Sequence, residues 1–307
     1  MSLQSSRRIM RFVVLAVIVA ALAGCKHRKH WGTKYFEIHA TPLDFPVTEY
    51  KLKHPDIGSF DYIAQVKDPD AILPSQRLAI VYVLGDGGSV DDNCTGFFVS
   101  KRDFLTAGHC VKDSSPNPSV DVDLGAKLGT RTAKCSVFPA PPSVKSQDWA
   151  ICSFGEDLDL GETFALTKCA PKPNDQVVIT GFCQVNQQAG VSAESITPAK
   201  TPNAGVLEML APEQGFLPGQ PLPGRSTSGC PLDSGGPAFL PEQLTRRSDN
   251  FYVLSGKTRV FGVVADIGIC PPGQNNRTCI APTTDPSFLS FLNDHKTGAV
   301  DILDCSE

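Results

Sequence analysis

The chain has 307 residues, 41% of them hydrophobic, and its 28 basic residues nearly balance its 32 acidic ones, for a net charge of −4. It lacks the basic excess of proteins that bind nucleic acid, so we expect no such partner. The portion from residue 76 onward is long enough to bury one sizeable core.

The first 24 residues have the composition of a secretory signal peptide. Three arginines between positions 7 and 11 precede an unbroken apolar run over residues 12–23. This run is shorter than the roughly 20 residues that cross a bilayer, so it fits an export signal that is later removed. The sequence Leu-Ala-Gly-Cys ending at Cys25 is similar to the lipobox of bacterial lipoproteins, which implies lipidation of Cys25. The alternatives are an ordinary signal peptide or an uncleaved anchor.

The cysteine count supports a special role for Cys25. The chain has 11 cysteines, an odd number, so one thiol is left over if the others pair. Lipidation of Cys25 accounts for that one and leaves an even set for disulfides, which form in oxidising compartments. No Cys-x-x-Cys pattern indicates zinc, and we expect neither a metal nor a cofactor.

Residues 25–75 contain prolines among mixed polar and aromatic residues and show no long periodic apolar pattern. We expect a tether or a propeptide here. The basic cluster 26–30 would lie against anionic headgroups beside the lipid, or would be a solvated tether without a role. The predicted location is the cell envelope, with a lipid anchor in a membrane; a periplasmic or secreted protein is the alternative.

The remainder, 76–307, is predicted to be an all-β domain. Glycine, proline and aspartate separate short β-branched and aromatic runs, which predicts antiparallel strands joined by turns. These runs lie at 78–84, 94–100, 150–154, 177–182, 251–254 and 260–264. A short C-terminal helix is expected over 286–295, where a proline is the first residue. The proline-rich stretch 185–229 is expected to be an irregular surface loop, or a loop that borders a substrate cleft.

Three segments carry residues that together can perform nucleophilic catalysis. Gly235 and Gly236 follow Ser234 and allow a sharp turn that exposes its hydroxyl, but a serine hydroxyl needs a base to become a good nucleophile. His109, in Thr-Ala-Gly-His-Cys, can take and return a proton near neutral pH. Asp148 can accept a hydrogen bond from the other ring nitrogen of that histidine.

The order His109, Asp148, Ser234, with the sequences TAGHC and DSGGP, resembles the chymotrypsin/trypsin-like serine proteases over roughly residues 77–293. The resemblance implies a chymotrypsin-like fold: two antiparallel six-stranded β-barrels, a connection near 160–175 and a short C-terminal helix. It also implies a serine endopeptidase that hydrolyses protein or peptide substrates through an acyl-enzyme intermediate. We expect a monomer.

By the same resemblance, the backbone N–H groups of Leu232 and Ser234 form the oxyanion hole. Relatives usually have glycine where this chain has Leu232, and loss of one donor typically costs about 10²–10³ in turnover. The primary specificity pocket falls on Ser228, Ala265 and Ile267. Ser228 in place of an aspartate argues against Arg or Lys before the cut, and Ile267 in place of glycine narrows the pocket. We therefore expect small or medium apolar residues there.

Disulfides are expected on both sides of this site. The resemblance implies that Cys94–Cys110 clamps the loop of the histidine and that Cys230–Cys270 braces the serine turn. Cys135–Cys152 is a further hypothesis, on two strands that would flank the aspartate.

Asp233 points to an activation step. In relatives, the aspartate before the nucleophile is buried and pairs with a newly cut N-terminal ammonium, and a buried carboxylate without a cation is strongly destabilising. The chain lacks the usual cleavage signature, and its nearest substitute suggests a cut near Ala71 or Ile72. Alternatively, Arg77 or a lysine replaces the ammonium and the protein is active while anchored.

Two other functions remain open. Leu232 is the feature that favours a catalytically silent protease homologue acting as a binding module. An esterase or other acyl hydrolase uses the same three residue types but needs a different fold and motif order.

Overall fold

The computed structural model describes the parts of the chain that carry the strands. The described residues are 49–54, 58–63, 79–85, 93–111, 117–125, 128–141, 144, 146–185, 196–222, 229, 231–246, 252–267 and 277–305. They belong to one unit, Leu43–Glu307. The predictions on the signal peptide, on Cys25 and on a cut near Ala71 lie outside them. No helix in these ranges is long and apolar enough to cross a membrane.

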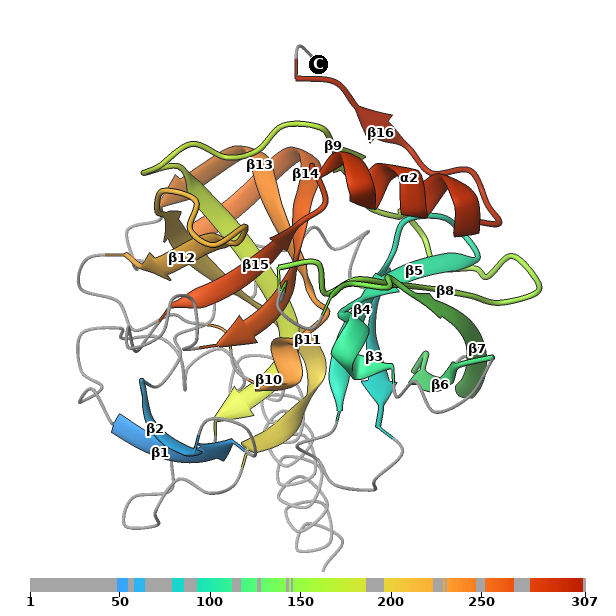
Figure 1. Ribbon diagram of the computed structural model, residues 1–307, viewed down its shortest axis with the longest axis horizontal. Coiled ribbons are helices and arrows are strands. Elements are labelled where there is room, and N and C mark those ends of the chain that lie inside the picture. The colour runs from blue at the N-terminus through green and yellow to red at the C-terminus, as the bar shows by residue number, and fades with distance from the viewer. Residues whose placement is uncertain are drawn as a thin grey trace, which may run out of the picture. The chain divides into compact units, whose positions relative to one another are not determined.

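Six strands of the described residues form a closed barrel in the first half of the domain (Figure 1). Neighbouring strands are antiparallel throughout. β6 alternates exposed and buried residues, as a strand with one face to the core and one to water does. In barrel order the strands are β3 (Ile80–Leu84), β4 (Cys94–Phe98), β5 (Asp103–Thr106), β8 (Ala150–Ser153), β7 (Thr130–Val137) and β6 (Ser119–Asp123).

A second antiparallel barrel follows, and it closes because β13 pairs with both β10 and β14. Two short strands, β9 (Ala165–Thr167) and β16 (Ile302–Leu303), extend this sheet in parallel from β14. The prediction of two six-stranded antiparallel barrels with one C-terminal helix is thus confirmed. The barrel strands in order are β13 (Pro237–Arg246), β10 (Gln176–Val185), β11 (Ile196–Met209), β12 (Leu217–Pro221), β15 (Thr278–Pro282) and β14 (Tyr252–Ile267).

The expected irregular loop over 185–229 is wrong, because β11 and β12 lie within it. The prolines misled the prediction, since proline has no N–H for a strand ladder. The structure tolerates Pro198 opposite Cys183, just past an irregularity in the pairing of β10 with β11. A hairpin of β1 (Glu49–His54) and β2 (Gly58–Ile63) also lies in the stretch expected to be a tether.

Trp149 lies in an aromatic cluster that joins α2 (Pro286–His295) to the first barrel. Its fully buried ring packs edge-on against Phe138 and against Phe288 of α2, with ring centroids 4.9 and 5.4 Å apart. The helix begins at Pro286 because Asp285 caps it, accepting a hydrogen bond from a first-turn N–H at 2.7 Å. The C-terminal helix therefore packs against the residue that follows Asp148.

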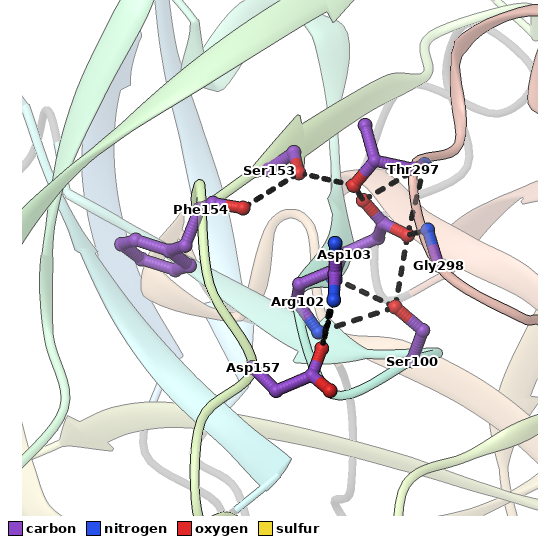
Figure 2. Close-up of polar contacts among 8 residues, drawn as sticks. All are labelled: Ser100, Arg102, Asp103, Ser153, Phe154, Asp157, Thr297 and Gly298. Carbon is purple, nitrogen blue, oxygen red and sulfur yellow. Dashed lines mark hydrogen bonds and ion pairs between the residues drawn. The ribbon is translucent and has the colours of Figure 1, made fainter.

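A buried aspartate ties the segment after α2 to the first barrel (Figure 2). Asp103, at the start of β5, is 0% exposed. Its carboxylate accepts hydrogen bonds from the N–H of Gly298 at 2.6 Å, the hydroxyl of Thr297 at 2.7 Å and the hydroxyl of Ser100 at 2.8 Å. Burial alone would raise the pKa of Asp103, but these hydrogen bonds hold its pKa below the ordinary value. The charged carboxylate thus stabilises the fold.

We expect Asp103→Asn to lower the free energy of unfolding at pH 7 by about 1.5–3 kcal/mol, because charge-assisted hydrogen bonds are lost and buried donors remain. The folded pKa of Asp103 lies below its unfolded value of about 3.9, so this contribution is complete above about pH 4 and fades as the pH falls through the folded pKa. The difference between wild type and variant should therefore shrink in acid. Denaturant unfolding at several pH values measures it.

Asp157→Asn is the matched control, since Asp157 is exposed and pairs with Arg102 at the surface at 2.7 Å. It should leave the midpoint of unfolding almost unchanged. Equal effects of the two variants would contradict a stabilising role for the buried carboxylate.

Candidate active site

His109 and Asp148 are brought together by the pairing of β5 with β8. Thr106, at the end of β5, pairs with Ala150, at the start of β8, so the residues after one strand meet those before the other. His109 lies in a single 3₁₀ turn, Gly108–Cys110, directly after β5. Its Nδ1 lies 2.6 Å from Asp148 Oδ2, and its backbone N–H donates to Asp148 Oδ1 at 2.8 Å. One carboxylate therefore orients both the ring and the backbone of His109.

Gly108 permits this close approach. A Cβ added there would lie 2.9 Å from Asp148 Oδ1 and 3.3 Å from the carbonyl of Trp149. The side chain of His109 is 48% exposed, whereas that of Asp148 is 19% exposed. The imidazole can thus meet a substrate from solvent while the carboxylate behind it stays largely covered.

Ser234 lies in a tight turn that leads into β13, which we call the serine turn (residues 231–236). The turn begins with the 3₁₀ helix Pro231–Asp233. Two hydrogen bonds tie it to β14: Gly235 N–H donates to the carbonyl of Val264 at 2.6 Å, and Val264 N–H donates to the carbonyl of Gly236 at 2.9 Å. Ser234 is 6% exposed. The two hydrogen bonds hold the backbone directly after Ser234 against β14.

The serine turn also contacts the first barrel. Thr95 N–H donates to the carbonyl of Ser234 at 2.8 Å, and the Sγ of Cys110 lies 3.8 Å from the same oxygen. Cys110 directly follows His109. The structure therefore places the backbone of Ser234 beside the segment that carries His109, although Ser234 leads into the second barrel.

Leu232 and Asp233, which precede Ser234, are both buried. The side chain of Leu232 is 0% exposed and Asp233 is 1% exposed. The Leu232 side chain thus does not project into solvent beside the serine. The carboxylate of Asp233 lies directly against Gly181 of β10.

The described residues contain only part of the predicted specificity pocket. Ala265 is buried in β14, and Ile267 ends that strand opposite Thr278 of β15. Ser228 lies outside the described residues.

Disulfides join the predicted cysteines on the His109 side. Cys94–Cys110 and Cys135–Cys152 are both present. Cys169–Cys305, which the sequence did not predict, ties the connection between the barrels to the C-terminal segment. Cys279 is also disulfide-bonded. The predicted pair Cys230–Cys270 lies outside the described residues.

One group of metal-binding residue types lies at this site. Ligand atoms of Cys94, His109 and Cys110 lie within 4.8 Å of one another. Both sulfur atoms are joined in a disulfide, so neither is the thiolate that binds metals. These three residues are therefore not a metal site, and the disulfide braces the loop that carries His109.

Sequence reasoning missed Thr95, which contacts the serine turn through its hydroxyl as well as its backbone. Its Oγ1 donates to the carbonyl of Leu232 at 2.6 Å. The only signal was its position next to Cys94, because its partners lie far away in the sequence.

Comparisons with known proteins bear on the family and the fold of the chain. The sequence matches the family model for Trypsin over residues 76–267. An inactivated protease paralogue of the scabies mite is 13% identical with a TM-score of 0.51, and the match covers 74% of this chain and 96% of the paralogue. A double mutant of human heparin binding protein is 14% identical with a TM-score of 0.50, and the match covers 75% and 97% of the two chains. No curated protein matches the sequence.

We expect Gly235→Ala to disrupt the serine turn. Gly235 has φ of +85°, and an added Cβ would overlap the carbonyl of Thr95 and the hydroxyl of Thr106. Gly125→Ala is the matched control, since Gly125 has φ of +80° with nothing within 4 Å. The left-handed conformation alone costs about 1–2 kcal/mol. Gly235→Ala should cost clearly more in thermal unfolding, or yield no folded protein where Gly125→Ala does. Equal costs would contradict the steric argument.

Proposed function

The chain belongs to the trypsin family, and we propose that it is a serine endopeptidase that cuts peptide bonds through an acyl-enzyme intermediate. The observation that carries this proposal is the 2.6 Å contact between His109 Nδ1 and Asp148 Oδ2 beside the serine turn. A carboxylate at Nδ1 selects the tautomer whose Nε2 accepts a proton. This is the state that a general base needs.

Each residue then has a defined role. His109 removes the proton of the Ser234 hydroxyl as Oγ attacks the carbonyl carbon, and it returns the proton to the leaving amine. Asp148 stabilises the imidazolium that forms between these steps. The N–H groups of Leu232 and Ser234 stabilise the oxyanion. Water then attacks the acyl-enzyme by the same route in reverse, and Ser234 is regenerated.

The proposed substrates are proteins or peptides with a small or medium apolar residue before the cut. Ser228 lacks the charge that would attract a basic residue. Ile267 would narrow the pocket, and Ala265, on the same strand, is buried. The cleavage profile on a mixed peptide library reads this preference directly.

A second candidate function is a catalytically silent homologue that acts as a binding module. Leu232 supports it, because a side chain stands where relatives usually have glycine in the oxyanion hole. The scabies mite protein of similar fold is itself named an inactivated protease paralogue. The chain has all three catalytic residue types, at His109, Asp148 and Ser234, which favours the enzyme over the silent homologue.

We expect purified wild-type protein to hydrolyse peptides and to react with a serine-directed phosphonate at Ser234. Ser234→Ala and His109→Ala should each lower turnover by about 10⁶, and the double variant should be little worse, because these residues act as a unit. Asp148→Asn should lower turnover by about 10⁴ through the wrong histidine tautomer. Ser119→Ala, at the exposed start of β6, is the control and should leave turnover unchanged. Folded wild-type protein that shows neither labelling nor hydrolysis, both uncut and after a cut near Ala71 or Ile72, would establish the silent homologue instead.

We also propose that the protein is exported and held to a membrane by lipidated Cys25. Disulfides such as Cys94–Cys110 and Cys169–Cys305 support an oxidising compartment. The proposed folded protease spans 76–307, and a cut near Ala71 or Ile72 would release it from its tether, with Asp233 receiving the new terminus.

Mass spectrometry of the mature N-terminus, with cell fractionation, tests this arrangement. Each buried CH₂ of a lipid chain adds about 0.8 kcal/mol of membrane binding, so more than one chain on Cys25 should keep the protein in the membrane fraction. Cys25→Ser should shift it to the soluble fraction. A soluble wild type with an unmodified start elsewhere contradicts the anchor, and full activity in the uncut form contradicts activation near Ala71.

A further inference from the structure

Thr95 of β4 contacts more parts of the site than its place in a strand requires. It is 0% exposed. Its hydroxyl donates to the carbonyl of Leu232 at 2.6 Å and accepts from the N–H of Phe182 at 3.2 Å. Its backbone N–H donates to the carbonyl of Ser234 at 2.8 Å. Its own carbonyl accepts the hydroxyl of Thr106 at 2.8 Å.

We propose that Thr95 is a positioning residue whose hydroxyl sets the serine turn against the barrel that carries His109. This proposal rests on the peptidase function proposed above.

Thr95 donates hydrogen bonds to two carbonyls, and the peptide groups that contain them lie on either side of the Asp233–Ser234 peptide group. The Leu232 carbonyl belongs to the peptide before Asp233, and the Ser234 carbonyl belongs to the peptide after Ser234. Between them lies the Asp233–Ser234 peptide, whose N–H is a proposed oxyanion donor. With both neighbouring peptides fixed, the middle one has little freedom to rotate away from the substrate. The hydroxyl thus preorganises a donor without touching the substrate.

The same residue is linked to the base. Cys94, next to Thr95, is bonded to Cys110, next to His109. The hydroxyl of Thr106 reaches Thr95 from the end of β5, the strand that leads to His109. Thr95 therefore connects the base and the nucleophile through short routes, and a shift of about 1 Å in such a geometry can cost about 10²-fold in rate.

The substitution Thr95→Val separates an effect on the positioning of the serine turn from an effect on the stability of the fold. Thr95→Val keeps the shape and the backbone N–H, but it leaves the buried carbonyl of Leu232 and the N–H of Phe182 without the hydroxyl. Thr167→Val is the matched control: the Thr167 hydroxyl is also buried, accepts an N–H from Cys169 at 3.1 Å and reaches the carbonyl of Leu303 at 3.5 Å. Both variants lose one bridging hydroxyl, but only the first touches the serine turn.

We expect Thr95→Val to lower kcat by about 10- to 100-fold while KM changes much less, since only the reacting geometry is disturbed. Thr95→Ser should restore kcat nearly to the wild-type value. Thr167→Val should lower Tm without the loss in kcat. If Thr95→Val does not fold, Thr95→Ala replaces it, because a water can enter the space and bond both partners without holding them rigidly.

The outcomes separate this inference from the proposed function. An active wild type with equal kcat in Thr95→Val, or Thr95→Ala in its place, and in Thr167→Val overturns the role of Thr95 and leaves the peptidase intact. Failure of Thr95→Ser to rescue kcat also overturns it. A wild type that neither hydrolyses peptides nor reacts with the phosphonate, both uncut and after a cut near Ala71 or Ile72, overturns the peptidase itself.

Discussion

The candidate site depends on a hydrogen bond that crosses between the two barrels, from Thr95 N–H to the carbonyl of Ser234 at 2.8 Å. His109 and Asp148 come from the first barrel, whereas Ser234 leads into the second. No local turn can therefore set the distance between base and nucleophile, which instead follows from how β4 meets the serine turn. An isolated serine hydroxyl is a weak nucleophile, so chemistry at this site requires that the two barrels pack in one register.

The fold class was predictable because strands with clear punctuation dominate the chain. Not every strand of the second barrel was visible in the sequence. β11 contains prolines, which normally argue against a strand, and its long-range pairing with β10 is seen only in the structure. The division into two six-stranded barrels came from the resemblance, since periodicity cannot tell which strands pair, and the order of the strands around each barrel came from the structure. The hairpin of β1 and β2 had no signal that distinguished it from the surrounding polar stretch.

The candidate site divides in the same way. His109 and Ser234 were recognisable because each lies in a short motif, TAGHC or DSGGP, and the other residues of the motif form the same local turn. Thr95 and Asp103 were not, because their partners are distant: the Thr95 hydroxyl meets a carbonyl 137 residues away, and Asp103 meets an N–H 195 residues away. A buried threonine and an aspartate at a strand start look ordinary in a sequence. Their roles exist only once the chain has folded.

The C-terminal segment contacts residues that precede or follow the members of the His109–Asp148 pair in the chain. Asp103, which holds Gly298, begins β5, and β5 ends at Thr106, three residues before His109. Phe288 of α2 packs against Trp149, which follows Asp148. α2 and the segment after it, which Asp103 holds through Gly298, therefore support both members of the pair, while β4 supports the serine turn. Each catalytic candidate is thus held by an element that contributes no catalytic residue of its own, so the rigidity of the site is a property of the whole domain.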